Sequence, residues 1–291
     1  NHSMNIKSPS SHRSQEPESS VLYIVGTPIG NLSDLSSRAL NILMNVSLIA
    51  CEDTRQTKKI MSKFNITNKL ISFNKHNSLI KIPKIINDLD SGKSIALVSD
   101  AGMPSICDPG EDLIKKAKNN GLKIICIPGP CAALTALVSS GLPSSKFTFE
   151  GFIPKKKSER EKLLLEIRKN DKTSIVFEAP HRLKTFLNEL KEYCGGKREI
   201  QVSRELTKRY EENIGDNIDD VIAYFEGKEV LGEITVVIKG ENKKKETSEF
   251  DKFEIKKELL DLIKAGLSLS QASKYLAKKN NLTKSVIYKM Y

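Results

Sequence analysis

The sequence lacks the long apolar runs and the cysteine pattern that would assign it to a membrane or to an oxidising compartment. No apolar stretch in its 291 residues approaches the length of about 20 residues that a membrane-spanning helix needs. The five cysteines are an odd number without the spacing of a zinc site, so neither a disulfide framework nor a metal centre is indicated. The first twenty residues are polar and contain no hydrophobic core of a signal peptide. We therefore expect a reduced, cytoplasmic protein that uses no metal ion.

Histidine is also scarce, and two common nucleotide-binding motifs are missing. Only His76 and His181 of the four histidines lie beyond the polar first twenty residues. The turn Gly26–Asn31 follows an apolar run, but it matches neither the G-x-G-x-x-G of dinucleotide-binding proteins nor the G-x-x-x-x-G-K-[ST] of a P-loop. A strand, a glycine turn and a helix can still bring backbone N–H groups close to a ligand, but most such junctions bind nothing, so the turn alone does not indicate a binding site.

Positive charge is in excess. Lys and Arg number 47 against 36 Asp and Glu, a net charge of +11 at pH 7. Such an excess favours a polyanionic partner, because cations that bind phosphates release counterions. A lysine-rich surface that only keeps the protein solvated would have the same composition, so the charge alone does not distinguish the two interpretations.

Short apolar runs alternate with segments of helical periodicity in the first half of the chain. These runs are continuously apolar, which is typical of strands buried on both faces. They are Val21–Val25, Leu48–Cys51, Ile95–Ser99 and Ile124–Pro128. Alternating strands and helices predict an α/β fold with a largely parallel sheet and helices on both faces. A second α/β unit is predicted to begin near Phe147, with strands at Phe147–Phe152, Ser174–Glu178, Ile200–Arg204 and Ile234–Lys239.

Composition changes along the chain predict five segments. They are a disordered tail (1–20), an N-terminal α/β domain (21–142), a second α/β domain (143–240), a charged linker (241–250) and a helical module (251–291). Within the module, Gly266 ends a helix, Ser268 with Gln271 forms a capping box for the next, and a third helix begins near Thr283. This pattern resembles a helix-turn-helix unit. The module either contacts nucleic acid or packs on the main body as a cap.

Seven sequence blocks occur in a characteristic order. They are Val21–Leu32, Cys51–Arg55, Val98–Pro104 with Asp108–Gly110, Pro128–Ala133, Glu150–Pro154, Phe177–Arg182 and Arg204–Lys208. In this order the chain resembles the 16S ribosomal RNA (cytidine-2′-O)-methyltransferases, which belong to the tetrapyrrole-methylase superfamily. The resemblance implies a two-domain tetrapyrrole-methylase-like fold with S-adenosylmethionine (SAM) as methyl donor in the interdomain cleft. It also implies a decoding-centre cytidine of 16S ribosomal RNA as acceptor, in the RNA or the small subunit, and a homodimer.

The resemblance places donor contacts at three of these blocks. Asp100 and Met103 follow a buried strand and, by resemblance, contact the methionine part of SAM. An Asp100 that only bonds its neighbours' N–H groups is the structural alternative. Cys131 and Ala132 begin a helix of small residues, and Pro28 lies in the first glycine turn, facing donor or acceptor. No basic side chain adjoins Cys131 in sequence, which argues against a catalytic thiol.

Three side chains are candidates for assisting attack by a ribose 2′-hydroxyl, which is a weak acid. His76 is the natural general base because histidine titrates near neutral pH, although a surface or RNA-stacking histidine fits the same polar loop. Glu178 and Lys208 lie at or just after the ends of predicted strands. The sequence does not choose among the three.

Cations after the strands of the second unit are candidate RNA contacts. Lys155, Lys156 and Lys157 precede a helix, where cations are unfavourable for the helix dipole. That mismatch favours a phosphate partner over a solvated helix start. Arg182 and Arg204 also follow strands and could bind phosphate.

Two other functions remain compatible with the sequence. A methylase of a small molecule such as a tetrapyrrole would use the same fold and donor, but would not account for the basic loop and tail. A non-catalytic nucleic-acid-binding protein would account for the basic helical module, but not for the Gly26 turn or the Asp100 loop.

Overall fold

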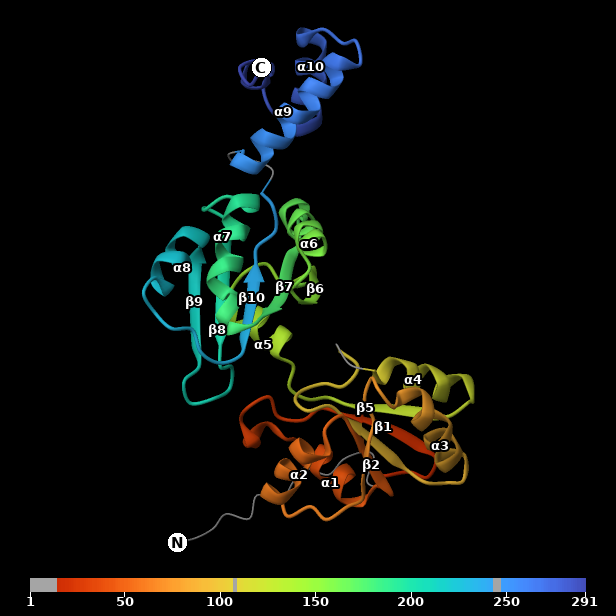
Figure 1. The fold of residues 1–291 in the computed structure, drawn as a ribbon. Helices are drawn as coiled ribbons and strands as arrows, with labels where there is room; N and C mark the ends of the chain where they lie inside the picture. Colours follow the sequence, from red (N-terminus) through yellow and green to blue (C-terminus); the bar gives the residue numbers. More distant parts are fainter. Residues whose placement is uncertain (1–14, 107–108, 243–246) are drawn as a thin grey trace. The chain divides into compact units, whose positions relative to one another are not determined.

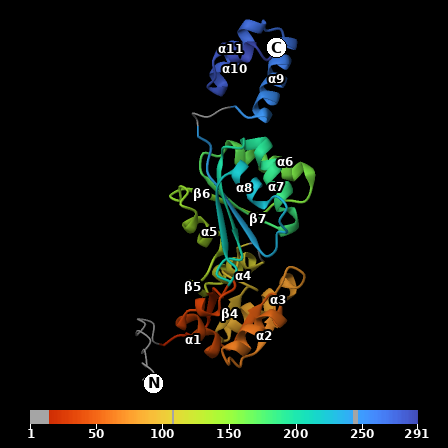
Figure 2. The ribbon, with the colours of Figure 1, turned by 90° about the vertical axis from the view of Figure 1, so that its left-hand side faces the viewer.

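The computed structural model describes residues 15–106, 109–242 and 247–291, and the chain forms two compact units, Asn1–Ala132 and Ala133–Tyr291. Each unit is built on a five-stranded sheet (Figures 1 and 2). Among the described residues, none of the helices combines the length and the apolar character that crossing a bilayer requires.

The sheet of the first unit is entirely parallel. Its strand order is β3-β2-β4-β1-β5. The strands are β1 (Val21–Val25), β2 (Leu48–Cys51), β3 (Leu70–Ser72), β4 (Ile95–Val98) and β5 (Lys123–Ile127). Strands β1, β2 and β4 are buried at every position, which is the reason for their continuously apolar sequences. The predicted parallel sheet is confirmed, whereas the short edge strand β3 had no clear sequence signal.

Helices cover both faces of this sheet. They are α1 (Ser37–Asn45), α2 (Thr54–Lys63), α3 (Ser78–Asp90) and α4 (Gly110–Asn119), with a 3-10 turn η1 (Leu32–Asp34) before α1. Tyr23 and its alternate neighbours in β1 pack with α1 and α2, whereas Leu22 packs with α3 and α4. The two pairs of helices therefore lie on opposite sides of the sheet (Figure 1). Gly121 follows α4 with a left-handed φ of 71°, a conformation that ends helices, while Asp108 of the block Asp108–Gly110 lies outside the described residues.

The predicted N-terminal tail is described only from residue 15 onward. Glu16 forms an ion pair of 2.8 Å with Arg38, and its own side chain is 2% exposed. The Ser19 hydroxyl donates to the Gly92 carbonyl at 2.6 Å, and Glu18 pairs with Lys123 at 2.7 Å. These contacts hold residues 16–19 on the first unit.

The second unit contains a mixed sheet. Its order is β6-β7-β10-β8-β9, and only β6 and β7 are parallel. The strands are β6 (Phe147–Phe152), β7 (Thr173–Glu178), β8 (Glu199–Arg204), β9 (Glu212–Asn217) and β10 (Ile234–Ile238). Strand β9 was not predicted because its sequence, ENIGDN, has neither an apolar run nor an alternation.

Three helices pack on one face of the second sheet. They are α6 (Lys157–Lys169), α7 (Leu183–Cys194) and α8 (Ile218–Phe225), and a 3-10 turn η2 (Pro180–Arg182) precedes α7. Phe186 of α7 is fully buried in their common core with Val202 and Val236. On the other face, Gln201 Nε2 donates to Ser139 Oγ of α5 (Ala132–Ser140) at 3.2 Å.

The C-terminal module consists of α9 (Glu249–Lys264), α10 (Leu269–Asn280) and α11 (Lys284–Tyr288). The predicted capping box of Ser268 and Gln271 begins α10, and Gly266 follows α9 with a φ of 107°. The buried residues of the module form a cluster of their own. They are Ile255, Leu259, Ala272, Leu276, Ala277 and Ile287. The module therefore has a separate core.

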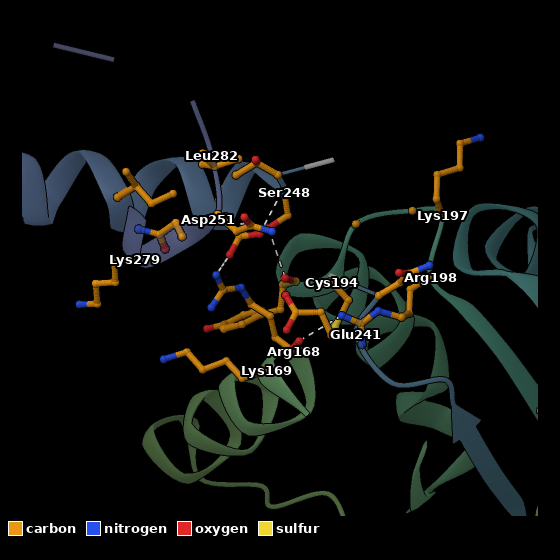
Figure 3. Close-up of a pocket in the computed structure, with 18 of the residues that line it drawn as sticks. Arg168, Lys169, Cys194, Lys197, Arg198, Glu241, Ser248, Asp251, Lys279 and Leu282 are labelled. Atoms are coloured by element: carbon orange, nitrogen blue, oxygen red, sulfur yellow. Dashed lines mark hydrogen bonds and ion pairs between the residues drawn. The ribbon is translucent and has the colours of Figure 1, made fainter. Parts of the chain in front are cut away.

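A few side chains join this module to the helices of the second sheet. Asp251 forms an ion pair with Arg168 of α6, and Ser248 Oγ donates to the Tyr193 carbonyl at 3.3 Å. The Phe250 ring stacks on Tyr193 with 4.4 Å between centroids. Arg168, Asp251 and Ser248 border an open groove between the module and α6 and α7, with Cys194 in its wall (Figure 3). Part of the predicted linker, residues 243–246, lies outside the described residues.

Candidate functional site

Three loops meet at the carboxyl ends of the adjacent strands β4, β1 and β5. The Thr27 N–H donates to the Gly102 carbonyl at 3.0 Å, and the Gly102 N–H donates to the Thr27 carbonyl at 3.0 Å. On the other side, the Gly26 N–H donates to the Ile127 carbonyl at 3.3 Å. Parallel strands end at one edge of the sheet, and open α/β sheets bind ligands at that edge. The folding of β1, β4 and β5 thus brings three separate sequence blocks together.

Glycine is required where these loops touch. A Cβ atom on Gly26 would lie 2.6 Å from Gly129 Cα and 2.6 Å from Met103 Sδ. A Cβ atom on Gly129 would lie 2.7 Å from Gly26 Cα. Gly102 has a φ of 77°, a conformation that side chains disfavour. Glycine at these positions therefore lets the backbones of the three loops pack directly against one another.

The Asp100 carboxylate links this edge to the next loop. Its Oδ1 accepts a hydrogen bond of 3.0 Å from the Asp53 N–H, at the end of β2. Asp53 in turn caps α2, because its Oδ1 accepts from the Arg55 N–H at 2.9 Å and pairs with the Arg55 guanidinium. The Arg55 backbone N–H and guanidinium hold the pKa of Asp53 below its usual range. Asp53 therefore caps α2, and Asp100 accepts a hydrogen bond from another loop.

The other predicted donor contacts belong to the same three loops. Pro28 is buried after Thr27, and Met103 is half-buried against Gly26. Cys131 and Ala132 are half-buried where α5 begins, directly after Pro130, whose carbonyl lies close to Gly102. The structure thus gathers Pro28, Asp100, Met103 and the loop of Cys131 in the first unit. Their contact with a donor stays a prediction.

Thr27 is a residue of this site that the sequence did not single out. Its side chain is 2% exposed, and Oγ1 has no hydrogen-bond partner among the described residues. The close approach of Gly26 to Gly129 was also unforeseen, although each glycine stood in a predicted turn. The one signal in the sequence for this contact is that both turns contain glycine.

The three candidate bases lie in different surroundings. His76 is exposed in the loop between β3 and α3 of the first unit, where its backbone N–H donates to Asn74 Oδ1 at 2.9 Å. Glu178 and Lys208 belong to the second unit. Glu178 ends β7, and Lys208 follows β8 and pairs with Glu205 at 3.3 Å.

Glu178 is 3% exposed. Its Oε1 accepts a hydrogen bond of 2.8 Å from the Ala179 N–H, while Oε2 lies 3.7 Å from Arg160 Nη2. Arg160 is shared with Glu189, to which it donates two bonds of 2.7 Å. Burial raises the pKa of Glu178, and the nearby guanidinium groups of Arg160 and Arg182 only partly oppose it. A buried carboxylate with a raised pKa is a stronger base than an ordinary glutamate and is suited to accept a proton.

One edge of the second sheet carries the lysines and arginines of this sheet that are predicted to contact RNA. Ile234 of β10 pairs with Glu178 on one side and with Arg204 on the other, so β7 and β8 end at the same edge. Lys155, Lys156 and Lys157 are exposed after β6, which runs parallel to β7. Helix α6 begins among them without a side-chain cap.

Arg182 and Arg204 differ in what their guanidinium groups contact. Arg204 Nε donates to Glu212 Oε2 at 2.8 Å, and its other nitrogens donate to the carbonyls of Leu231 at 3.1 Å and Tyr210 at 3.2 Å. Arg204 therefore braces the loops around it, and phosphate binding would compete with these bonds. Arg182 is half-exposed before α7. Phosphate binding by either arginine stays a prediction.

The chain is similar to a known protein family and to named relatives. The model of the family described as Tetrapyrrole (Corrin/Porphyrin) Methylases matches residues 21–221. A relative from Bacillus subtilis is 42% identical over 274 residues, which cover 93% of this chain and 94% of the relative. One from Thermotoga maritima is 45% identical over 219 residues, 75% of this chain and 98% of the relative. Both are named "Ribosomal RNA small subunit methyltransferase I".

Solved structures share the fold at low sequence identity. A cobalt precorrin-4 methyltransferase has a TM-score of 0.57 at 12% identity, over 76% of this chain and 95% of its own. A diphthine synthase has a TM-score of 0.55 at 15% identity, over 80% of this chain and 93% of its own. The predicted tetrapyrrole-methylase-like α/β fold is thereby confirmed, together with its C-terminal helices.

Proposed function

Because the chain belongs to the tetrapyrrole methylase family, and within it to the ribosomal RNA small subunit methyltransferase I proteins, we propose that it methylates small-subunit ribosomal RNA with SAM as donor. The finer part of the proposal is the acceptor atom, the ribose 2′-oxygen of a cytidine in the decoding centre of 16S RNA. That part is supported by the resemblance of the seven sequence blocks.

The glycine-lined junction of the β1, β4 and β5 loops is the observation that carries the donor assignment. SAM combines a flat adenosine with a charged methionine part. The contact of Gly26 with Gly129 holds the β1 and β5 loops against each other at the carboxyl edge of the sheet, where open α/β sheets bind ligands. The buried Thr27 hydroxyl has no partner among the described residues, and the Asp100 carboxylate can attract an ammonium group. We assign Pro28, Asp100, Met103, Cys131 and Ala132 as donor contacts.

When bound, SAM supplies a methyl group on a cationic sulfonium. The ribose oxygen forms a bond to the methyl carbon as the carbon–sulfur bond breaks, and the bonding pair stays on sulfur. The thioether that leaves is neutral and needs no acid, so the chain has to orient the acceptor and take one proton from the 2′-hydroxyl. Glu178, with its raised pKa, is suited to that proton, and Lys208 and His76 are the other candidates.

The cations of the second unit support an RNA acceptor. Lys155, Lys156 and Lys157 are exposed at the sheet edge where Arg182 also follows a strand, and phosphates bound there would release counterions. A tetrapyrrole or another small acceptor does not require these cations, and the solved neighbours that act on such molecules share only the fold. The acceptor in this proposal is the small ribosomal subunit or its RNA, and the homodimer that the resemblance implies stays a prediction.

Two measurements test the proposal. Calorimetric titration with SAM should show weaker binding to Asp100→Ala than to the wild type, whereas Asp90→Ala, an exposed carboxylate at the end of α3, should bind normally. Small ribosomal subunits from a strain that lacks this protein should accept labelled methyl groups from SAM when the protein is added. Mass mapping should place the label on the ribose of one cytidine. Equal SAM affinity in both variants would overturn the donor site. A label on a base, or no label on ribosomal RNA, would overturn the acceptor.

A further inference from the structure

Two aromatic side chains are largely exposed at the edge of the second sheet that carries the cations. Phe152, the last residue of β6, is 65% exposed, and Tyr210, just before β9, is 68% exposed. Large aromatic side chains usually bury most of their surface, so a pair left open at one edge indicates a binding surface. We call Phe152 and Tyr210 the aromatic pair.

The sheet topology places the two rings at the same edge. Phe152 pairs with Phe177, next to the end of β7, and Arg204 at the end of β8 lies opposite Ile234 on the far side of β10. Strands β6 and β8 are three positions apart in the sheet. With neighbouring strands roughly 5 Å apart, the two sides of this edge are about 15 Å from one another. That distance spans two or more nucleotides of an extended single strand.

Arg204 fixes the backbone that presents Tyr210. Its guanidinium donates to the Tyr210 carbonyl at 3.2 Å and to the Leu231 carbonyl at 3.1 Å. Within the same loop, Glu205 and Thr207 have left-handed φ angles of 54° and 69°, which are costly for residues with a side chain. Strained backbone that persists is held by its surroundings and is typical of functional loops. Tyr210 is therefore held in place by the loop around it.

Phe152 is braced by another ring. Phe177 contacts it edge-to-face, with 5.3 Å between centroids and 63° between planes. The Phe152 side chain is 65% exposed, so most of its surface stays open. On the opposite side of the sheet edge, the Arg209 guanidinium lies 5.5 Å from the Tyr210 ring. Both rings thus have one defined protein contact and a large free surface.

Exposed flat rings beside exposed cations match single-stranded RNA in their chemistry. Bases stack on aromatic rings, and the backbone phosphates pair with lysine and arginine. Lys155, Lys156 and Lys157 follow Phe152 within a few residues, and Arg209 precedes Tyr210. An apolar protein partner would offer these cations no anionic groups. We propose that Phe152 and Tyr210 each stack on a base of unpaired RNA while the lysines bind its phosphates. This inference rests on the proposed function.

Binding of a fluorescein-labelled single-stranded oligocytidylate, measured by anisotropy at several salt concentrations, tests this inference. Phe152→Ala and Tyr210→Ala should each bind roughly five- to 150-fold more weakly, because each loses one stacking contact. Their salt dependence should match the wild type, since no phosphate contact is lost. The triple Lys155→Ala, Lys156→Ala, Lys157→Ala variant should instead show a flatter salt dependence.

Matched variants separate stacking from a loss of structure. Phe147→Ala truncates an aromatic side chain that is 40% exposed at the other end of β6, and it should bind RNA normally. Tyr210→Phe keeps a flat ring and should retain affinity, while Tyr210→Leu keeps the apolar bulk and should lose it. SAM affinity should be unchanged in every variant.

Several outcomes would overturn the aromatic pair as a stacking site. They are unchanged RNA affinity in both alanine variants, equal losses in Tyr210→Phe and Tyr210→Ala, or a normal Tyr210→Leu. Retained RNA affinity together with loss of a protein partner would identify a protein-docking surface instead. If the wild type methylates ribosomal RNA while the alanine variants bind oligocytidylate normally, the proposed function stands and only this inference fails.

Discussion

Glu178 illustrates how the place of one side chain in a sheet sets its chemistry. The sequence indicates three side chains that could take the proton of the ribose 2′-hydroxyl, and Glu178 is one of them. The structure buries it at the end of β7, with its two oxygens directed to the Ala179 N–H and toward Arg160. Burial raises its pKa, so a proton leaves the folded state less readily than the unfolded one.

This raised pKa predicts how stability depends on pH. At acid pH the carboxyl is protonated in both states and contributes no difference. As the pH rises from the ordinary glutamate pKa, about 4.3, to the raised value, the unfolded state loses the proton first, so the folded protein loses stability. Glu178→Gln keeps an oxygen acceptor for the Ala179 N–H but does not titrate. Urea unfolding should therefore show the variant gaining stability relative to the wild type as the pH rises to neutrality. A constant difference would contradict the raised pKa.

At the scale of elements, the junction of the β1 and β5 loops depends on glycine at two positions. Gly129→Ala would place a Cβ atom 2.7 Å from Gly26 Cα, a distance at which the two backbones must separate. We expect this variant to lose about 1–3 kcal/mol of stability, as overpacked sites do, and to bind SAM more weakly.

Gly215→Ala is the matched control, because its Cβ atom in β9 would meet nothing closer than 3.8 Å. Calorimetry with SAM and thermal melting of both variants check the prediction. Normal SAM affinity in Gly129→Ala would show that the loop contact does not shape the donor site.

The N-terminus of α6 is a second feature at the scale of elements. Lys156 occupies the cap position and Lys157 the first turn, where the helix dipole favours anions, and no side chain caps the helix. A phosphate at this end would satisfy both the free N–H groups and the lysines. The local mismatch is therefore consistent with the proposed RNA contact.

At the scale of the whole molecule, the C-terminal module is joined to the second sheet by few contacts and has its own core. Its apolar side chains, Leu259 and Leu276 among them, pack with one another and not into the core beneath α7. The separate core indicates that the loops at the edge of the first sheet fold without the module.

Truncation after Asn242 should therefore leave SAM affinity unchanged and weaken RNA binding, because it removes twelve lysines, nine of them in the module. Arg168 would lose Asp251, so we expect a loss of about 1–2 kcal/mol, equivalent to a few degrees in melting temperature. Burial raises the pKa of Cys194 to about 11, and this thiol lies in the groove beneath the module (Figure 3).

Iodoacetamide should consequently modify Cys194 faster in the truncated chain than in the full chain, while Cys126 in the first unit reacts equally in both. Impaired SAM binding after truncation would instead make the module a structural part of the donor-binding body.

Local signals in the sequence determined the elements and the family. Continuous apolar runs marked β1, β2 and β4, because strands buried on both faces need apolar side chains at every position. Caps such as Ser268 and Gln271 act within one helical turn and are therefore readable from four consecutive residues. The ordered sequence blocks identified the family for the same reason, since each is short and contiguous.

Only the tertiary structure decided which of these segments touch. The contact of Gly26 with Gly129 and the bond from the Asp53 N–H to Asp100 join residues far apart in the chain, and no local pattern encodes such pairs. Strand β9 forms without an apolar pattern because pairing with β8 satisfies its backbone. Arg204 has the same charge as Arg182, yet its guanidinium is bound by carbonyls and Glu212 and so holds Tyr210 in place. The role of a charged side chain depends on the acceptors that folding places around it, and these come from distant parts of the chain.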